Sequence, residues 1–188
     1  RTPDMNNLRR VYRSFDFGSL LSLHMLETRL LAREPEVTLA ALTDPATAAT
    51  ALATLNAPTR QMLGTEQMGW LTQQMTASSA TWQVLGQQVL MARMDFPASV
   101  LQALVPANDP ADGARAVADY LLARELAASA PELMTPEQQA LVDPVRNPRL
   151  GYNMDAWDGY PAARETLLTT ASGLGKRLVS LAGDTHNA

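Results

Sequence analysis

The stretch Arg177-Leu-Val-Ser-Leu-Ala-Gly-Asp-Thr-His-Asn-Ala188 closes the chain and says most about its fold. It opens with a short apolar run around Val179 and Leu181, which predicts a buried β-strand. Gly183 breaks the run, and Asp184 and His186 follow two residues apart, so an extended loop turns both side chains to one side. Open α/β sheets bind ligands beyond the carboxyl ends of their strands. The stretch therefore predicts an α/β fold with a candidate site at the end of its last strand.

Asp184 and His186 allow two interpretations. A carboxylate and an imidazole are good ligands for a hard or borderline metal ion. Alternatively, Asp184 makes a turn and His186 is an ordinary surface histidine. The spacing alone leaves both interpretations open.

Several segments upstream share their order and separations with a known family. They are Gly64-Thr-Glu-Gln-Met-Gly-Trp-Leu71, Ser79-Ala-Thr-Trp-Gln-Val-Leu-Gly-Gln-Gln-Val-Leu-Met91 and Asp155-Ala-Trp-Asp-Gly-Tyr-Pro-Ala-Ala-Arg164, followed by Gly183-Asp-Thr-His186. Together they resemble the C-terminal half of the catalytic domain of the alkaline phosphatase D family, metallophosphoesterases that are similar to purple acid phosphatases. Tyr12-Arg-Ser-Phe-Asp-Phe-Gly18 and Met25-Leu-Glu-Thr-Arg29 resemble it as well, so the resemblance covers nearly the whole chain.

The resemblance implies a fold, an activity and cofactors. The expected fold is part of a two-sheet sandwich flanked by helices, and the expected activity is hydrolysis of phosphodiesters and phosphomonoesters by a metal-bound hydroxide. Asp184 is then a metal ligand and His186 lies at the metal centre, with Ca²⁺ and Fe³⁺ as the implied ions. An exported protein, periplasmic or extracellular, is also implied.

Family members carry further metal-binding aspartates and an asparagine before the stretch that corresponds to Tyr12, and they continue beyond Gly-Asp-x-His. We therefore expect residues 1–188 to form a single partial domain, truncated at both ends and inactive alone. A different class of function stays open, namely a non-catalytic α/β interaction module with an incomplete metal site.

Two more groups of residues are candidates for positions near the site. Asp155 and Asp158 flank Trp157, and two carboxylates in that arrangement either bind a cation or substrate or cap the helix that begins at Pro161. Glu27 and Arg29 lie just past an expected strand, where they form either the rim of the site or a local ion pair. His24, inside that strand, is expected to be a satisfied or exposed histidine rather than a ligand.

Composition excludes several other classes of protein. The net charge is −4 and no basic cluster occurs, so the chain has no nucleic-acid footprint. No run of about 18 apolar residues is present, so no membrane span is expected. The absence of cysteine excludes disulfides, thiolate catalysis and zinc–cysteine sites from these residues. The expected partner is a phosphate-ester substrate, by resemblance.

The spacing of apolar residues and the positions of capping residues, glycine and proline predict both strands and helices. Strands are expected over residues 17–26 and 82–91, and helices over residues 44–55, 66–78, 112–128 and 135–141 and from Pro161 onward. Residues 95–113 hold three prolines and are expected to be irregular. In the helix over residues 112–128, Val117, Leu121, Leu122 and Ala128 are expected to face the core.

Overall fold

The structure is a computed structural model that describes residues 10–104 and 109–183. Its contacts divide the chain into two compact units. The first combines the residues up to Val37 with Leu52–Ala92 and the residues from Asn153 onward, and the second combines Thr38–Ala51 with Arg93–Tyr152. None of the helices in the described ranges is both long enough and apolar enough to cross a bilayer.

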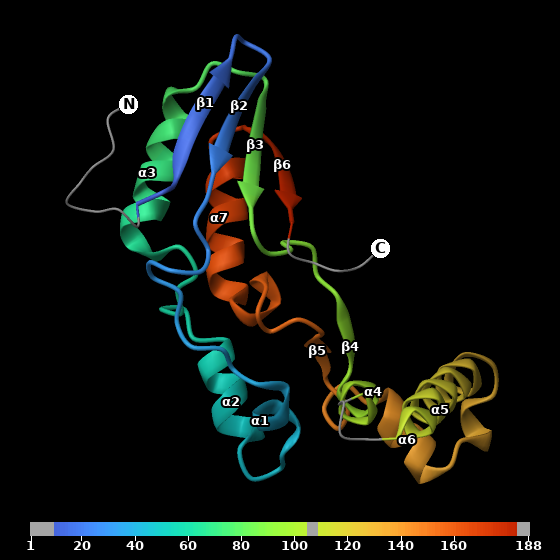
Figure 1. Ribbon diagram of the computed structural model, residues 1–188. Helices are drawn as coiled ribbons and strands as arrows, with labels where there is room; N and C mark the ends of the chain where they lie inside the picture. The colour runs from blue at the N-terminus through green and yellow to red at the C-terminus, as the bar shows by residue number, and fades with distance from the viewer. Residues whose placement is uncertain (1–9, 105–108, 184–188) are drawn as a thin grey trace. The chain divides into compact units, whose positions relative to one another are not determined.

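A four-stranded sheet organises the first unit. Its strands are β1 (Arg13–Phe17), β2 (Leu21–Met25), β3 (Trp82–Gln87) and β6 (Arg177–Ala182), in the order β1-β2-β3-β6. The β1–β2 pair is antiparallel, whereas β2, β3 and β6 are parallel (Figure 1). The α/β prediction is therefore confirmed.

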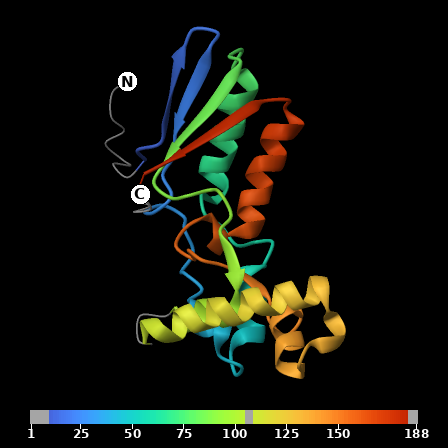
Figure 2. The same ribbon diagram turned by 90° about the vertical axis from the view of Figure 1, so that its right-hand side faces the viewer.

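Two helices cover one face of this sheet. α3 (Gly64–Ala77) connects β2 to β3 and α7 (Pro161–Gly173) precedes β6, and both lie on the same side of the strands (Figure 2). Pro161 occupies the first turn of α7, where its fixed φ and missing N–H cost nothing. The core between helices and sheet is built from fully or nearly fully buried side chains, among them Leu71, Met75, Leu85, Trp157, Tyr160, Leu167 and Ala171.

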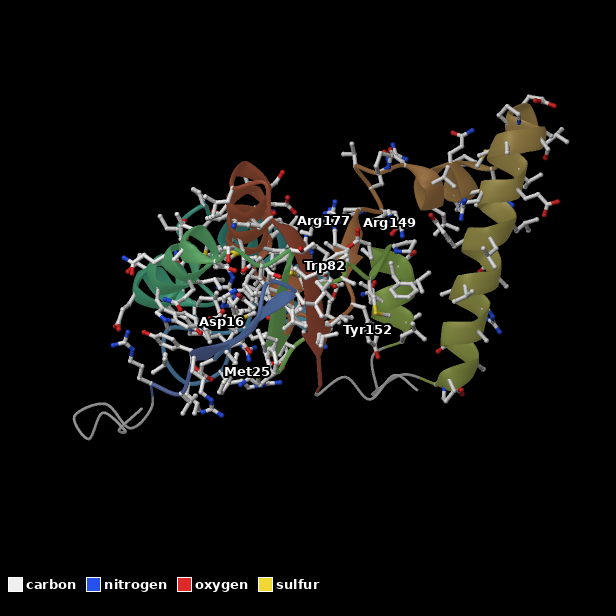
Figure 3. All side chains as sticks on the ribbon, turned by 90° about the horizontal axis from the view of Figure 1, so that it is seen from above. Asp16, Met25, Trp82, Arg149, Tyr152 and Arg177 are labelled. Carbon is white, nitrogen blue, oxygen red and sulfur yellow. The ribbon has the colours of Figure 1, made fainter. Side chains whose placement is uncertain are left out.

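The opposite face of the sheet is open among the described residues. Phe15, Leu23, Val84 and Val179 stand in one row of the ladder. On the same face, Arg177 lies over Trp82, with its guanidinium carbon 5.7 Å from the ring centroid (Figure 3). Burial of β6 was expected and is wrong: Val179 is 37% exposed and Leu181 56%. The apolar run identified the strand, but β6 is an edge strand with one uncovered face.

The helix-facing side of β2 carries a buried polar network around His24. Nε2 of His24 lies 2.8 Å from Oε1 of Gln83, whose amide nitrogen already donates to Oγ of Ser78. Nε2 must therefore carry the proton, and Nδ1 accepts from the hydroxyl of Ser14 at 2.7 Å. The expectation of a satisfied strand histidine is confirmed.

This network predicts that the stability of the fold decreases at acidic pH. Burial lowers the pKa of His24 below its ordinary value of 6.5, against the opposing effects of the Gln83 hydrogen bond and the charge of Asp16. The unfolded chain then binds a proton more readily than the folded chain, so this contribution to stability is complete above pH 6.5 and is lost as the pH falls through the folded pKa. Urea unfolding at pH 7.5 and at about pH 5 should show a larger loss for wild type than for His24→Gln. Equal losses would contradict the assignment.

The second unit contains a two-stranded sheet and short helices. β4 (Asp95–Pro97) pairs antiparallel with β5 (Arg149–Gly151). The helices are α1 (Leu39–Thr43), α4 (Ala98–Ala103), α5 (Pro110–Ser129) and α6 (Pro136–Val142), with a 3-10 turn at Pro131–Leu133. α2 (Ala48–Leu55) begins in this unit and ends in the first.

Three expectations in this region need correction. The helix expected over residues 44–55 begins only at Ala48, because Asp44 ends α1 and its side chain accepts the N–H of Ala46 in the turn before α2. Residues 95–113 contain β4, α4 and the start of α5. In α5, the expected core residues Val117, Leu121, Leu122 and Ala128 are exposed. The buried positions of α5 are Gly113 and Ala123, and a Cβ on Gly113 would lie 2.9 Å from the Leu104 side chain. α5 therefore packs through its small residues.

Candidate functional site

The parallel strands β2, β3 and β6 bring three chain segments to one edge of the sheet. Glu27 and Arg29 follow β2, Gln88 follows β3, and Gly183 follows β6. The carboxyl ends of parallel strands are where α/β sheets bind ligands. The sheet has such an edge, and the candidate residues within the described ranges can be compared with it.

Asp184 and His186 lie outside the described residues. The last described residue, Gly183, donates its N–H to the carbonyl of Gln87 at 3.2 Å. The metal-ligand assignment of Asp184 and His186 thus stays a prediction.

Glu27 organises the backbone that follows β2. It is 2% exposed, and its two carboxylate oxygens accept the N–H groups of Arg29, Leu30 and Leu31 at 2.8–3.0 Å. The side chain of Gln67 holds the Glu27 peptide from the other side, with bonds of 2.8 Å to its N–H and 2.7 Å to its carbonyl. These bonds engage both oxygens of Glu27 and give the carboxylate a role in shaping the loop.

Arg29 reaches Asp155 across the unit. Its guanidinium lies 2.7 Å from one oxygen of Asp155, and Arg33 pairs with the other oxygen. Arg33 also donates to the hydroxyl of Tyr160 at 2.9 Å. Burial raises the pKa of Asp155, but the hydrogen bond and charge of Arg33 and then of Arg29 outweigh it, so the pKa lies below its usual value. Asp155 is therefore a carboxylate neutralised by two arginines.

Trp157 and Asp158 sit in a buried 3-10 turn, η2 (Trp157–Gly159), before α7. The indole N–H of Trp157 donates to Oε1 of Gln87 at 2.8 Å. Asp158 pairs with Arg164 at 3.3 Å, and both side chains are 4% exposed. The N-cap of α7 is Tyr160, so neither Asp155 nor Asp158 occupies the capping position. Contact of these carboxylates with a cation or substrate stays a prediction. The geometry gives each carboxylate an arginine partner.

A cavity of about 500 Å³ opens beside the first turn of α3. Two carboxylates, Glu34 and Glu66, are part of its lining, and the rest is apolar or uncharged: Tyr12, Leu31, Ala32, Gln61, Leu63, Gly64, Thr65 and Gln67. Both carboxylates have arginine partners, Arg60 for Glu34 at 3.6 Å and Arg10 for Glu66 at 3.7 Å.

Within residues 10–104 and 109–183, no group of three or more His, Cys, Asp and Glu side chains comes together as a metal site. Glu27, Asp155 and Asp158 are engaged by N–H groups or arginines, as described above.

Sequence reasoning missed the glutamines at the end of β3. Gln87 contacts Trp157 and Ser180, and Gln88 accepts the N–H and hydroxyl of Thr28 at 3.1 and 2.7 Å. The signal was present as two consecutive amides inside an apolar stretch that was expected to be one strand through Met91. In the structure the strand ends at Gln87.

One family model, one characterised protein and one solved structure match this chain. The model of the family described as PhoD-like phosphatase matches residues 1–188. Alkaline phosphatase D of Bacillus subtilis (strain 168) is 26% identical over 185 residues, which are 98% of this chain and 22% of that protein. A solved structure of PhoD superposes with a TM-score of 0.56 at 25% identity, over 94% of this chain and 24% of the other. The chain thus spans about a quarter or less of the length of the relatives it matches.

Proposed function

Because this chain belongs to the PhoD-like phosphatase family, we propose that the protein containing it hydrolyses phosphate esters by means of bound metal ions. The observation that carries the proposal is the match of the family model to residues 1–188. Phosphodiesters and phosphomonoesters are the substrates to test. We also propose that the protein is exported to the periplasm or beyond the cell, which cell fractionation checks.

Asp184 and His186 are the metal ligands of this proposal, with Ca²⁺ and Fe³⁺ as the first ions to test. Support comes from β6, a parallel strand that ends at Ala182, two residues before Asp184 in the sequence. A carboxylate and an imidazole suit these ions. The remaining ligands come from outside residues 10–104 and 109–183.

Metal ions of this kind lower the pKa of a bound water and polarise a phosphoryl oxygen. In this proposal the side chains of the protein position the reacting groups and supply charge. Asp184 supplies negative charge at the cations, and the arginine partners of Asp155 and Asp158 keep those carboxylates in the scaffold. Catalysis of phosphoryl transfer depends mainly on such positioning and on neutralisation of charge.

The test compares the full-length protein with the 188-residue chain. Each is assayed with bis(p-nitrophenyl) phosphate and p-nitrophenyl phosphate, with Ca²⁺ and Fe³⁺ supplied. We expect metal-dependent turnover by the full-length protein that a chelator abolishes. The chain alone should show no turnover above background, because it lacks most of a metal site among its described residues.

The same assay distinguishes a phosphoesterase from the second candidate, a non-catalytic interaction module. A full-length protein that holds no metal and hydrolyses neither ester would contradict the phosphoesterase proposal and favour the interaction module. Turnover by the homogeneous chain alone would contradict the expectation that its metal site is incomplete.

A further inference from the structure

We propose that the exposed face of α5 is a dimer interface, in which the helix packs antiparallel against α5 of a second copy of this protein. α5 is the longest helix in the described ranges, with 20 residues. It belongs to the second unit, whereas the described carboxylates of the candidate site belong to the first. Dimer formation through α5 is therefore a property beyond the proposed hydrolysis.

α5 is packed on one side and apolar on the other side as well. Its buried positions are Gly113 and Ala123, and the helix packs against α4 and α6. Leu121 is 54% exposed and Leu122 is 50% exposed. A surface helix normally turns one apolar stripe to the core and a polar face to water, so a second apolar stripe indicates a second contact. The exposed apolar residues of this stripe are Ala111, Ala114, Val117, Ala118, Leu121, Leu122 and Ala128.

The exposed stripe follows the heptad repeat of a coiled coil. Its a positions are Ala111, Ala118 and Glu125, and its d positions are Ala114, Leu121 and Ala128. Two helices that pair through their a and d positions bury these side chains in a continuous seam. Alanine at most of the positions allows a short distance between the helix axes, because that distance depends on the side chains at the contact. Leu121 then fills the centre of the seam.

The charges at this stripe favour an antiparallel pair of identical helices. In a parallel pair, Glu125 would face Glu125 of the second copy, and like charges at a contact are unfavourable. An antiparallel pair can set Leu121 opposite Ala118 of the second copy. Glu125 then comes beside Arg115 of the second copy, and the two-fold symmetry forms this ion pair twice. No ion pair within the described residues involves Glu125 or Arg115.

A membrane surface fits this face less well than a second copy does. Helices that lie on membranes carry many basic residues along their polar face. In α5, Arg115 and Arg124 are outnumbered by Asp112, Asp119 and Glu125. A seam of 20 residues is about 30 Å long, which places the contact among the smaller specific interfaces. We therefore expect a dimer that dissociates on dilution.

Sedimentation velocity of the full-length protein, from nanomolar to high micromolar concentration, measures this equilibrium. Leu121→Gln puts an amide at the centre of the seam and should raise the Kd of the dimer by about 10-fold or more. Leu133→Gln is the matched control, because Leu133 is 68% exposed and lies in the 3-10 turn after α5, outside the seam. It should keep the wild-type Kd. A wild-type protein that is monomeric throughout would overturn the dimer, as would equal Kd values for wild type and Leu121→Gln.

Charge reversal tests the antiparallel direction. Arg115→Glu and Glu125→Arg each place like charges at two points of the interface and should raise the Kd by about 10-fold or more. The double variant exchanges the two charges and should return the Kd to the wild-type value. The two residues are about 15 Å apart along one helix, so no ion pair within a single α5 accounts for the recovery. A double variant as weak as either single variant would overturn the antiparallel arrangement.

Vesicles of phosphatidylglycerol give the opposing outcome. A protein that binds them through Leu121 and stays monomeric would show that α5 contacts a membrane and that the dimer is wrong. Ester hydrolysis is not used in any of these measurements. A monomeric protein that hydrolyses esters would therefore contradict the dimer alone, and a dimeric protein without metal or turnover would contradict the proposed function alone.

Discussion

Asp184→Asn in the full-length protein should lower metal content and turnover together, with kcat falling by about 100-fold or more. The substitution keeps the shape of the side chain but removes the negative charge that offsets the cations. Metal ions contribute several kcal/mol of transition-state stabilisation in such sites, and about 1.4 kcal/mol corresponds to tenfold in rate. Elemental analysis beside kcat measures both effects on the same preparation.

His186→Ala should act in the same direction but more mildly, by about 10- to 100-fold if the imidazole orients a ligand rather than binding metal itself. The control is His24→Gln, which changes a histidine whose two ring nitrogens are already bonded to Ser14 and Gln83. It should leave metal content and kcat of the folded protein near wild type. Full metal and near-normal kcat in Asp184→Asn would refute the ligand assignment and remove the main residue-level support for the proposed function.

The helices that sequence patterns located well are those with strong local signals. Pro161 predicted the start of α7, and residues 135–141 predicted α6, whose capping box between Thr135 and Gln138 is present. Caps and prolines act through nearby backbone groups, so they are visible without the tertiary structure. The α/β class followed from the same elements.

Burial was less predictable because it depends on what lies opposite. The apolar residues of β6 and α5 identified a strand and a helix, but Leu181 and Leu121 are exposed. In α5 the packed face consists of small residues such as Gly113 and Ala123, which let neighbouring segments approach the helix closely. A scale of hydrophobicity would instead assign the exposed leucines to the buried face. The hairpin of β1 and β2 was missed because Gly18, at φ 59°, makes a turn inside a stretch expected to be one strand.

The candidate site was predictable only in outline. The carboxyl edge follows from the directions of the strands. Most of the residues named as candidates are described residues of the first unit, whereas Asp184 and His186 lie outside the described residues. The sequence did not predict which residues these side chains bind. The pairs Arg29–Asp155, Arg33–Asp155 and Trp157–Gln87 join residues 70 to 126 positions apart. Spacing in sequence carries no information about such long-range bonds.

Gly159→Ala should destabilise the protein by about 3 kcal/mol, a large effect for one methyl group. A Cβ at this position would lie 1.9 Å from the carbonyl oxygen of Met154 and 2.9 Å from its carbonyl carbon. These are backbone atoms, so no side-chain rotation relieves the overlap. The shift would also disturb the carbonyl of Gly159, which accepts the Nε–H of the buried Arg60 at 2.8 Å. Urea unfolding followed by tryptophan fluorescence measures the loss.

Gly173→Ala is the matched control, because no atom lies within 4 Å of a Cβ added there and the residue is the last of α7. It should be neutral or stabilising by up to about 1 kcal/mol, since alanine is the better helix former. If Gly159→Ala unfolds with wild-type stability, the close packing of the Trp-Asp-Gly-Tyr turn on Met154 is wrong. If it is destabilised as expected but keeps its metal when folded, the glycine of this motif serves packing: it lets the turn that holds Trp157 against Gln87 approach the preceding backbone.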